Sequence, residues 1–159
     1  IRGNIDSRIS KVKTGEYDGT ILALAGIQTL KLDHEIKKIF SEEKIIPCAG
    51  QGVIAVQCRK NDFENLKILK KINDEDTKIC AITERSLLKT IGGNCHTAVG
   101  AYAKIDNNNI IIIAQLFSDD GLKSFSIKKI GDKKLPEKLG ISAGKELLKK
   151  SEGYYKKKR

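Results

Sequence analysis

A cysteine and a histidine stand side by side in the stretch IGGNCHTAVGAYA, residues 91–103, directly after two glycines. Because the sequence holds only four cysteines and two histidines, this position makes Cys95 the first candidate for thiol chemistry. A thiolate is a soft, strong nucleophile, and flanking glycines leave room for a bulky group to approach the backbone. An arbitrary cysteine, however, is more often an inert apolar side chain, so the pattern around Cys95 has to decide between the two readings.

The other candidate ligands give no sign of a metal centre or a disulfide framework. Cys48, Cys58 and Cys80 lie among apolar residues and form no CxxC pair, and His96 has no second histidine nearby. The start of the sequence lacks the pattern of a signal peptide, and no apolar run approaches the roughly 20 residues that span a bilayer. We therefore expect reduced thiols, no metal, no membrane and a cytoplasmic location.

The net charge of +10 raises the question of a nucleic-acid partner. Only the tail, residues 151–159, ends in a basic run, whereas the other lysines are scattered along the chain. Scattered lysines are typical of a solvated surface, and aromatic residues make up only 5% of the sequence. Nucleic-acid binding therefore stays as an alternative and is not favoured.

The second half of the sequence predicts helices around a small antiparallel sheet. Apolar residues at helical spacing follow a cap at Asp62, and a longer helix with an acidic first turn ends near Gly92. Three strand-like runs follow, separated by DNNN and DDG, and a last helix can cover one face of the sheet. The runs are TAVGAYAKI, IIIIAQLFS and LKSFSIKKI, and the last helix is LPEKLGISAGKELLKK.

The first half of the sequence predicts a piece of an α/β layer. Ile5, Ile9 and Val12 share one helical face before Gly15, and DHEIKKIF reads as a second helix. TILALAG, residues 20–26, and GVIAVQC, residues 52–58, are short continuous apolar runs, which are typical of strands buried on both faces. The breaker PCAGQG precedes the second of these runs.

Four segments then resemble the porphobilinogen deaminase family in order and spacing. They are RGNIDSRISKVKTGEYDGTILALAGI, IPCAGQGVIAVQCR, TERSLL and GGNCHTAVGAYA. The resemblance implies a transferase of tetrapyrrole and heme biosynthesis, hydroxymethylbilane synthase. Such an enzyme adds four porphobilinogens to a dipyrromethane primer with loss of ammonia, through an electrophilic azafulvene, and is expected to be a monomer.

The resemblance also implies the residues that hold the primer. Cys95 matches the cysteine that carries the dipyrromethane through a thioether. Arg2 and Arg8 resemble carboxylate-binding positions, where a guanidinium fork suits the acetate and propionate groups of the pyrroles. Without the resemblance both arginines would read as solvated surface residues. Gln51 and Gly52 match a turn near the cofactor, although the same pattern also fits a plain turn between layers.

The sequence departs from the family pattern at two places. Thr29 stands where the family usually has another carboxylate-binding arginine, and the point charge of the nearby Lys31 could replace a planar fork only in part. The catalytic aspartate of the family lies in an N-terminal domain without a counterpart here, and none of Asp6, Asp18 or Asp33 matches it. We therefore expect no catalytic residue of this reaction in the chain, which should be inactive alone.

The sequence contains no methionine, position 1 included, so we expect a fragment. The resemblance implies a partial periplasmic-binding-protein-like α/β domain followed by a small C-terminal domain with a three-stranded antiparallel sheet and helices. The expected parts are a partial second domain at residues 1–43 and a return segment of the missing first domain at residues 44–60. A connecting helix at 61–73, the cofactor-attachment domain at 74–150 and a basic tail at 151–159 follow. The alternative from another class is a non-catalytic remnant or a basic interaction module that binds nucleic acid.

Overall fold

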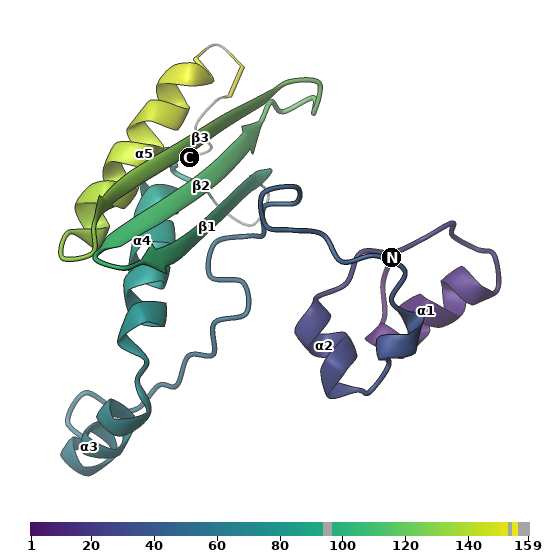
Figure 1. Cartoon of the computed structure of the whole chain (residues 1–159), viewed down its shortest axis with the longest axis horizontal. Coiled ribbons are helices and arrows are strands. Elements are labelled where there is room, and N and C mark those ends of the chain that lie inside the picture. Colours follow the sequence, from purple (N-terminus) through teal and green to yellow (C-terminus); the bar gives the residue numbers. More distant parts are fainter. Residues whose placement is uncertain (94–96, 153, 156–159) are drawn as a thin grey trace. The chain divides into compact units, whose positions relative to one another are not determined.

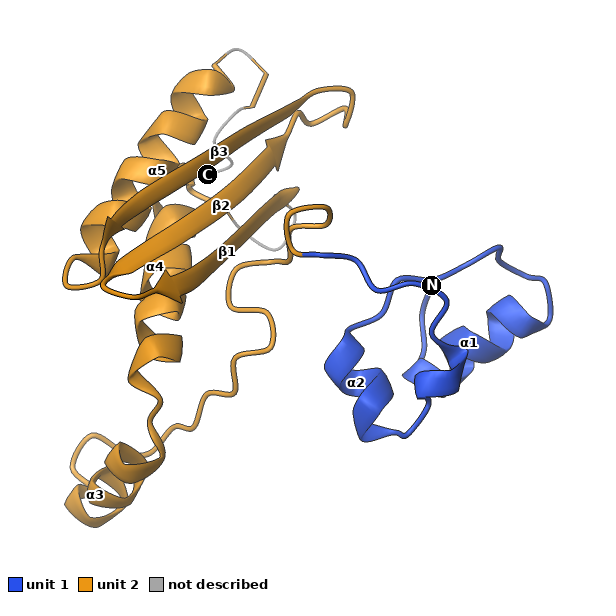
Figure 2. Ribbon diagram, in the orientation of Figure 1, with its two compact units in different colours: residues 1–41 blue, residues 42–159 orange. Residues whose placement is uncertain are grey.

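The computed structural model describes residues 1–93, 97–152 and 154–155. The chain divides into two units, residues 1–41 and residues 42–159 (Figure 2). No helix of the described residues is both long and apolar enough to cross a membrane.

The first unit, residues 1–41, consists of short helices. Helix α1 spans Ile5–Lys13 and helix α2 spans Leu24–Thr29, followed by a 3₁₀ helix, η1, at Asp33–Glu35. The predicted first helix is thus confirmed. A Cβ placed on Gly26 of α2 would lie 2.8 Å from the Ile5 side chain, so the two α-helices pack closely.

The predicted helix over DHEIKKIF was wrong, because only the three residues of η1 are helical there. An ion pair between Lys13 and Glu35 attaches this short helix to α1. The side chains of Ile39 and Phe40 are exposed, so no buried apolar face supports a longer helix in this segment.

The predicted strands at residues 20–26 and 52–58 were also wrong. In the described part of the chain, strands occur only from Val99 onward, and part of the first run belongs to helix α2. Ile21 is 68% exposed and Ile54 is 91% exposed. A buried strand needs neighbours on its edges and faces, and the described residues leave these apolar side chains largely uncovered.

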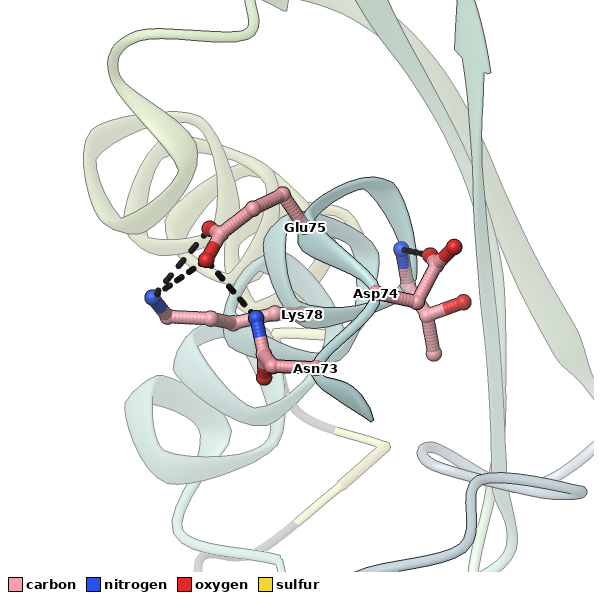
Figure 3. Close-up of polar contacts among 5 residues, drawn as sticks. Asn73, Asp74, Glu75 and Lys78 are labelled. Atoms are coloured by element: carbon pink, nitrogen blue, oxygen red, sulfur yellow. Dashed lines mark hydrogen bonds and ion pairs between the residues drawn. The ribbon is translucent and has the colours of Figure 1, made fainter. Parts of the chain in front are cut away.

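The second unit carries the predicted helices and sheet. Helix α3 spans Phe63–Ile72 and begins at Asp62, whose carboxylate accepts a hydrogen bond from the Asn65 amide. Helix α4 spans Glu75–Ile91, and Asp74 caps it by accepting a hydrogen bond from the Thr77 amide (Figure 3). Figure 3 also shows Glu75 in the first turn, where its carboxylate contacts Lys78 and Asn73. Both capping carboxylates satisfy amides that a helix start leaves without partners.

The sheet is antiparallel, with the order β1-β2-β3, as the sequence predicted. Its strands span Val99–Asp106, Asn109–Phe117 and Ser124–Asp132. The first hairpin turns through Asn107, which has a φ of 56°, a backbone conformation typical of a two-residue hairpin loop. Alternate residues of β2, beginning with Ile110, are fully buried, so this central strand fixes which face forms the core.

Helix α5, Pro136–Lys150, lies with α4 on one face of the sheet (Figure 1). The two helices approach closely because α5 presents Gly140 and Gly144 to α4. A Cβ on Gly140 would lie 2.2 Å from the Thr83 carbonyl oxygen. The core between helices and sheet is completed by side chains of these elements, among them Leu87, Ile91, Ile112, Leu116 and Leu147.

Candidate functional site

The connection between α4 and β1 carries the first candidate residue. Cys95 itself, with its neighbours Asn94 and His96, lies outside the described residues. The structure does fix both ends of the connection. Helix α4 stops at Gly92, which has a φ of 68°, and the Gly93 amide donates to the Leu88 carbonyl. On the other side, the Phe117 amide donates to the Ala98 carbonyl, so the chain re-enters the sheet directly after the connection.

Gly92 and Gly93 have separate reasons for being glycine. Gly92 occupies the left-handed backbone region that ends a helix and that side chains disfavour. At Gly93, a Cβ would lie 2.5 Å from the Leu88 side chain. The two glycines before Cys95 are therefore explained by the end of the helix and the packing beneath it, and not only by space for a ligand.

The turn at residues 48–53, here called the Gly50 turn, carries the candidates Gln51 and Gly52. Its backbone closes through hydrogen bonds from the Gln51 amide to the Cys48 carbonyl and from the Val53 amide to the Gly50 carbonyl. Gly50 and Gly52 have φ values of 76° and 80°, and no heavy atom lies within 4 Å of a Cβ built on either. Gln51 is exposed. The turn thus presents bare backbone and one amide side chain at the surface of its unit.

Glu84 attaches the Gly50 turn to the helix and the sheet. Its side chain lies inside the unit, with only 6% of the residue exposed. One carboxylate oxygen accepts a hydrogen bond of 2.7 Å from the Gly50 amide, and the other accepts one of 2.7 Å from the Ala103 amide of β1. Burial raises the pKa of Glu84, while the hydrogen bonds from the two amides act in the opposite direction.

A further amide of β1 donates a hydrogen bond to a group outside the sheet, in addition to the Ala103 amide that donates to Glu84. The Ala101 amide donates to the Pro47 carbonyl at 2.9 Å. The Ile105 amide lies near the Cys80 thiol. Gly100 lets the chain approach here, because a Cβ would lie 2.6 Å from the Ile46 carbonyl oxygen. Segment 46–50 is therefore fixed along the edge of β1 just before the Gly50 turn.

Sequence reasoning gave Glu84 no role, although a signal was present. Cys80, Glu84, Leu87 and Ile91 follow one another at spacings of four, three and four, which places them on one face of α4. Leu87 and Ile91 are fully buried. A carboxylate on the apolar stripe of a helix needs hydrogen-bond donors, so its position alone points to a structural or functional partner.

The remaining cysteines differ in exposure. Cys48 is exposed and Cys58 is partly buried. Burial and the Glu84 carboxylate raise the pKa of Cys80 to about 11. Because the thiolate is the reactive form, Cys80 is a poor nucleophile at neutral pH. Among the described residues, no cluster of histidine, cysteine, aspartate and glutamate has an arrangement suited to holding a metal ion.

Arg2 and Arg8 belong to the first unit, whereas Gln51, Gly52 and Glu84 belong to the second. The Arg8 Nε donates to the Gly3 carbonyl at 2.9 Å, which fixes this guanidinium beside the start of α1. Arg2 is exposed. Within the described residues, neither guanidinium lies within 4.0 Å of a carboxylate oxygen. Among the residues that the structure describes, both positive charges thus lack an ion-pair partner, which suits an anion-binding role.

Thr29, at the position where an arginine was expected, does not offer its hydroxyl proton to a ligand. Its hydroxyl donates to the Ala25 carbonyl one turn earlier, at 2.8 Å. The nearby Lys31 is exposed and has a φ of 56°. The end of α2 therefore supplies an exposed ammonium group but no guanidinium fork.

Comparison with known proteins matches both parts of the chain to one family. Residues 1–67 match the family model described as "Porphobilinogen deaminase, dipyromethane cofactor binding domain". Residues 78–149 match the model described as "Porphobilinogen deaminase, C-terminal domain".

Curated relatives give the same result. The porphobilinogen deaminase of Francisella tularensis subsp. tularensis, strain WY96-3418, is 38% identical over 148 residues. That of subsp. novicida, strain U112, is 37% identical over 148 residues. Each match covers 93% of this chain but 49% of the relative, so the chain spans about half the length of these curated relatives. The two family models and these relatives together show that the chain belongs to the porphobilinogen deaminase family.

Proposed function

We propose that this chain is the C-terminal part of a hydroxymethylbilane synthase of tetrapyrrole and heme biosynthesis. The complete enzyme condenses four porphobilinogens on a covalently bound dipyrromethane primer with loss of ammonia. The single observation that carries the proposal is the match of two family models, in chain order, to residues 1–67 and 78–149. Cys95 lies within the second match, and we propose it as the attachment site of the primer.

The residues of the chain fit a primer that carries several carboxylates. Arg2 and Arg8 supply guanidinium groups without a carboxylate within ion-pair distance among the described residues. Gln51 and Gly52 supply an amide side chain and accessible backbone in the Gly50 turn. When bound, dipyrromethane supplies the pyrrole to which the substrate units are added. The role of this chain is to hold that group by a thioether and to neutralise its carboxylates.

The catalytic step itself needs residues beyond those assigned here. We propose that the carboxylate that stabilises developing positive charge belongs to the part of the family fold that this chain does not match. Preorganised electrostatic stabilisation of that kind contributes orders of magnitude in rate. The isolated chain should therefore make no linear tetrapyrrole. Porphobilinogen and an N-terminal half of the enzyme are the partners that this proposal requires.

The exposed apolar segments suit the same proposal. Ile54 is 91% exposed, Val56 is 60% exposed and Ile21 is 68% exposed. We propose that their segments complete periplasmic-binding-protein-like α/β domains when the remainder of the fold is present, because apolar strands are stable only with neighbours. The complete enzyme would then be a cytoplasmic monomer.

Intact-mass spectrometry with peptide mapping tests the proposal. The chain is co-expressed with the N-terminal part of a full-length relative, such as the Francisella tularensis protein, and is then supplied with porphobilinogen. We expect an adduct of two pyrrole units on the peptide that contains Cys95, and none in Cys95→Ala. An adduct on Cys48, Cys58 or Cys80, or one that survives Cys95→Ala, would contradict the assignment. Salt-dependent binding of DNA or RNA without any adduct would favour a basic interaction module instead.

A further inference from the structure

The Gly50 turn depends on a side chain outside any role proposed so far. Glu84 is a buried carboxylate that accepts one hydrogen bond from a backbone amide of the turn and one from a backbone amide of β1. Each oxygen takes a different donor, so the carboxylate bridges two segments that lie 53 residues apart at Gly50 and Ala103. A neutral amide in place of the carboxylate has one acceptor oxygen and could satisfy only one of these two donors.

We propose that Glu84 is a positioning residue of the cofactor site, and that it acts by holding the Gly50 turn against the edge of β1. The inference rests on the proposed function, because that function assigns Gln51 and Gly52 of this turn to the cofactor. The hydrogen bond to Glu84 fixes the position of the Gly50 amide. Gln51 and Gly52, the next two residues, are then positioned through the backbone. Without this hydrogen bond, the turn can reorient, because Gly50 and Gly52 have positive φ values and glycine can adopt many backbone conformations.

The surroundings of Glu84 argue for a local effect on the turn. Segment 46–47 is held separately, since the Ala101 amide donates to the Pro47 carbonyl and Gly100 contacts Ile46. Loss of the Glu84 bond should therefore release the residues after Pro47 and leave that segment in place. The burial that raises the pKa of Glu84 also supports a local effect on the turn, because a buried carboxylate depends on fixed hydrogen-bond donors of the protein.

Two variants on the same helix provide matched controls. Glu75→Gln makes the same chemical change as Glu84→Gln, but at an exposed residue whose partners are Asn73 and Lys78 (Figure 3). Cys80→Ala changes a partly buried residue one turn earlier on the same face of α4, near the Ile105 amide of β1, and keeps both acceptor oxygens of Glu84. A general weakening of this edge would appear in Cys80→Ala as well as in Glu84→Gln.

The first measurement is amide hydrogen exchange on the complete 159-residue chain. In Glu84→Gln we expect protection of the Gly50 amide to fall by about ten-fold, which corresponds to the loss of one hydrogen bond to an ionised group. Protection in α5 and β2 should stay unchanged, and Glu75→Gln and Cys80→Ala should keep wild-type protection at Gly50. If Glu84→Gln does not fold, the wild-type chain serves instead: its Gly50 and Ala103 amide shifts should titrate together with one pKa. Independent titration, or wild-type protection of Gly50 in Glu84→Gln, would overturn the proposal.

The second measurement connects the turn to the cofactor. The same variants are co-expressed with the N-terminal part of the relative and supplied with porphobilinogen, and the adduct on Cys95 is quantified by mass. We expect about ten-fold slower adduct formation in Glu84→Gln and a wild-type rate in both controls. Equal slowing in Cys80→Ala, or normal adduct formation in Glu84→Gln, would refute positioning while the proposed function stands. No adduct in the wild type would reject the proposed function and, with it, this inference.

Discussion

Substitution of Gly140 by alanine tests whether the close contact between α4 and α5 stabilises the second unit. Two effects oppose each other at this site. Alanine favours a helix interior over glycine by about 1 kcal/mol, so the same change on an exposed helix face would stabilise it. At Gly140, however, the new Cβ would lie 2.2 Å from the Thr83 carbonyl oxygen and 2.7 Å from the Ser86 Cβ.

The steric term should win because the atoms it meets cannot rotate away. The carbonyl of Thr83 and the amide of Leu87, at 3.1 Å, belong to the backbone of α4, so the helices themselves must separate. Overpacking of a filled core costs about 1–3 kcal/mol, and a clash with backbone belongs at the upper end of that range. After the gain of about 1 kcal/mol from helix propensity, we expect the free energy of unfolding to fall by about 2 kcal/mol.

Thermal and denaturant unfolding, followed by far-ultraviolet circular dichroism, measures this change. A loss of about 2 kcal/mol should lower the Tm of the second unit by about 10 °C. Lys145→Ala is the matched control on the same helix, since Lys145 is exposed, and its effect should stay within about 0.5 kcal/mol. A Gly140→Ala chain as stable as the wild type, or more stable, would refute the reasoning about the contact.

The remaining predictions concern charge recognition and thiol reactivity. In the co-expressed enzyme, Arg2→Leu and Arg8→Leu should each slow adduct formation or elongation, with a loss of about 1.5–3 kcal/mol per charged hydrogen bond. Lys157→Leu, in the tail outside the described residues, should have little effect, and wild-type kinetics in both arginine variants would reject their roles. The pKa of Cys80, raised to about 11, keeps this thiol neutral at pH 8. Iodoacetamide should therefore modify the exposed Cys48 first, and the Cys80 rate should rise only as the pH approaches that pKa; equal rates at pH 8 would contradict the burial argument.

The sequence predicted those elements whose signals are local. Asp62 and Asp74 cap helices because each carboxylate accepts a hydrogen bond from the backbone amide three residues later in the chain. That geometry needs no distant partner. Gly92 ends α4 for the same kind of reason, since glycine adopts the left-handed backbone without strain. The two hairpin signals likewise predicted the antiparallel sheet. The run IIIIA in β2 does not alternate with polar residues, so the choice of its buried face became visible only in the structure.

The two strands predicted in the first half show where local signals are insufficient. An apolar run such as residues 52–58 indicates that the segment favours burial. It does not show whether neighbouring strands are present to bury it. In the structure Ile54 and Val56 are exposed, and the run is not a strand. The segments of the first half that resemble the family nevertheless lie within the matched residues 1–67. A family match depends on the identity and spacing of residues along the chain, and not on whether a segment forms its strand.

By itself, the sequence determined the helices and hairpins of the second unit, since each rests on residues close together in the chain. The order and spacing of four segments indicated the family and, with it, the candidate thiol. Tertiary structure alone decided that Glu84 joins the Gly50 turn to β1, and that Gly100, Gly140 and Gly144 allow close backbone approach. These features depend on pairs of residues 19 to 57 positions apart, such as Glu84 with Ala103 and Gly140 with Thr83. A buried carboxylate or a missing Cβ has a meaning only when its distant partner is in place, because burial and contact are properties of the folded chain.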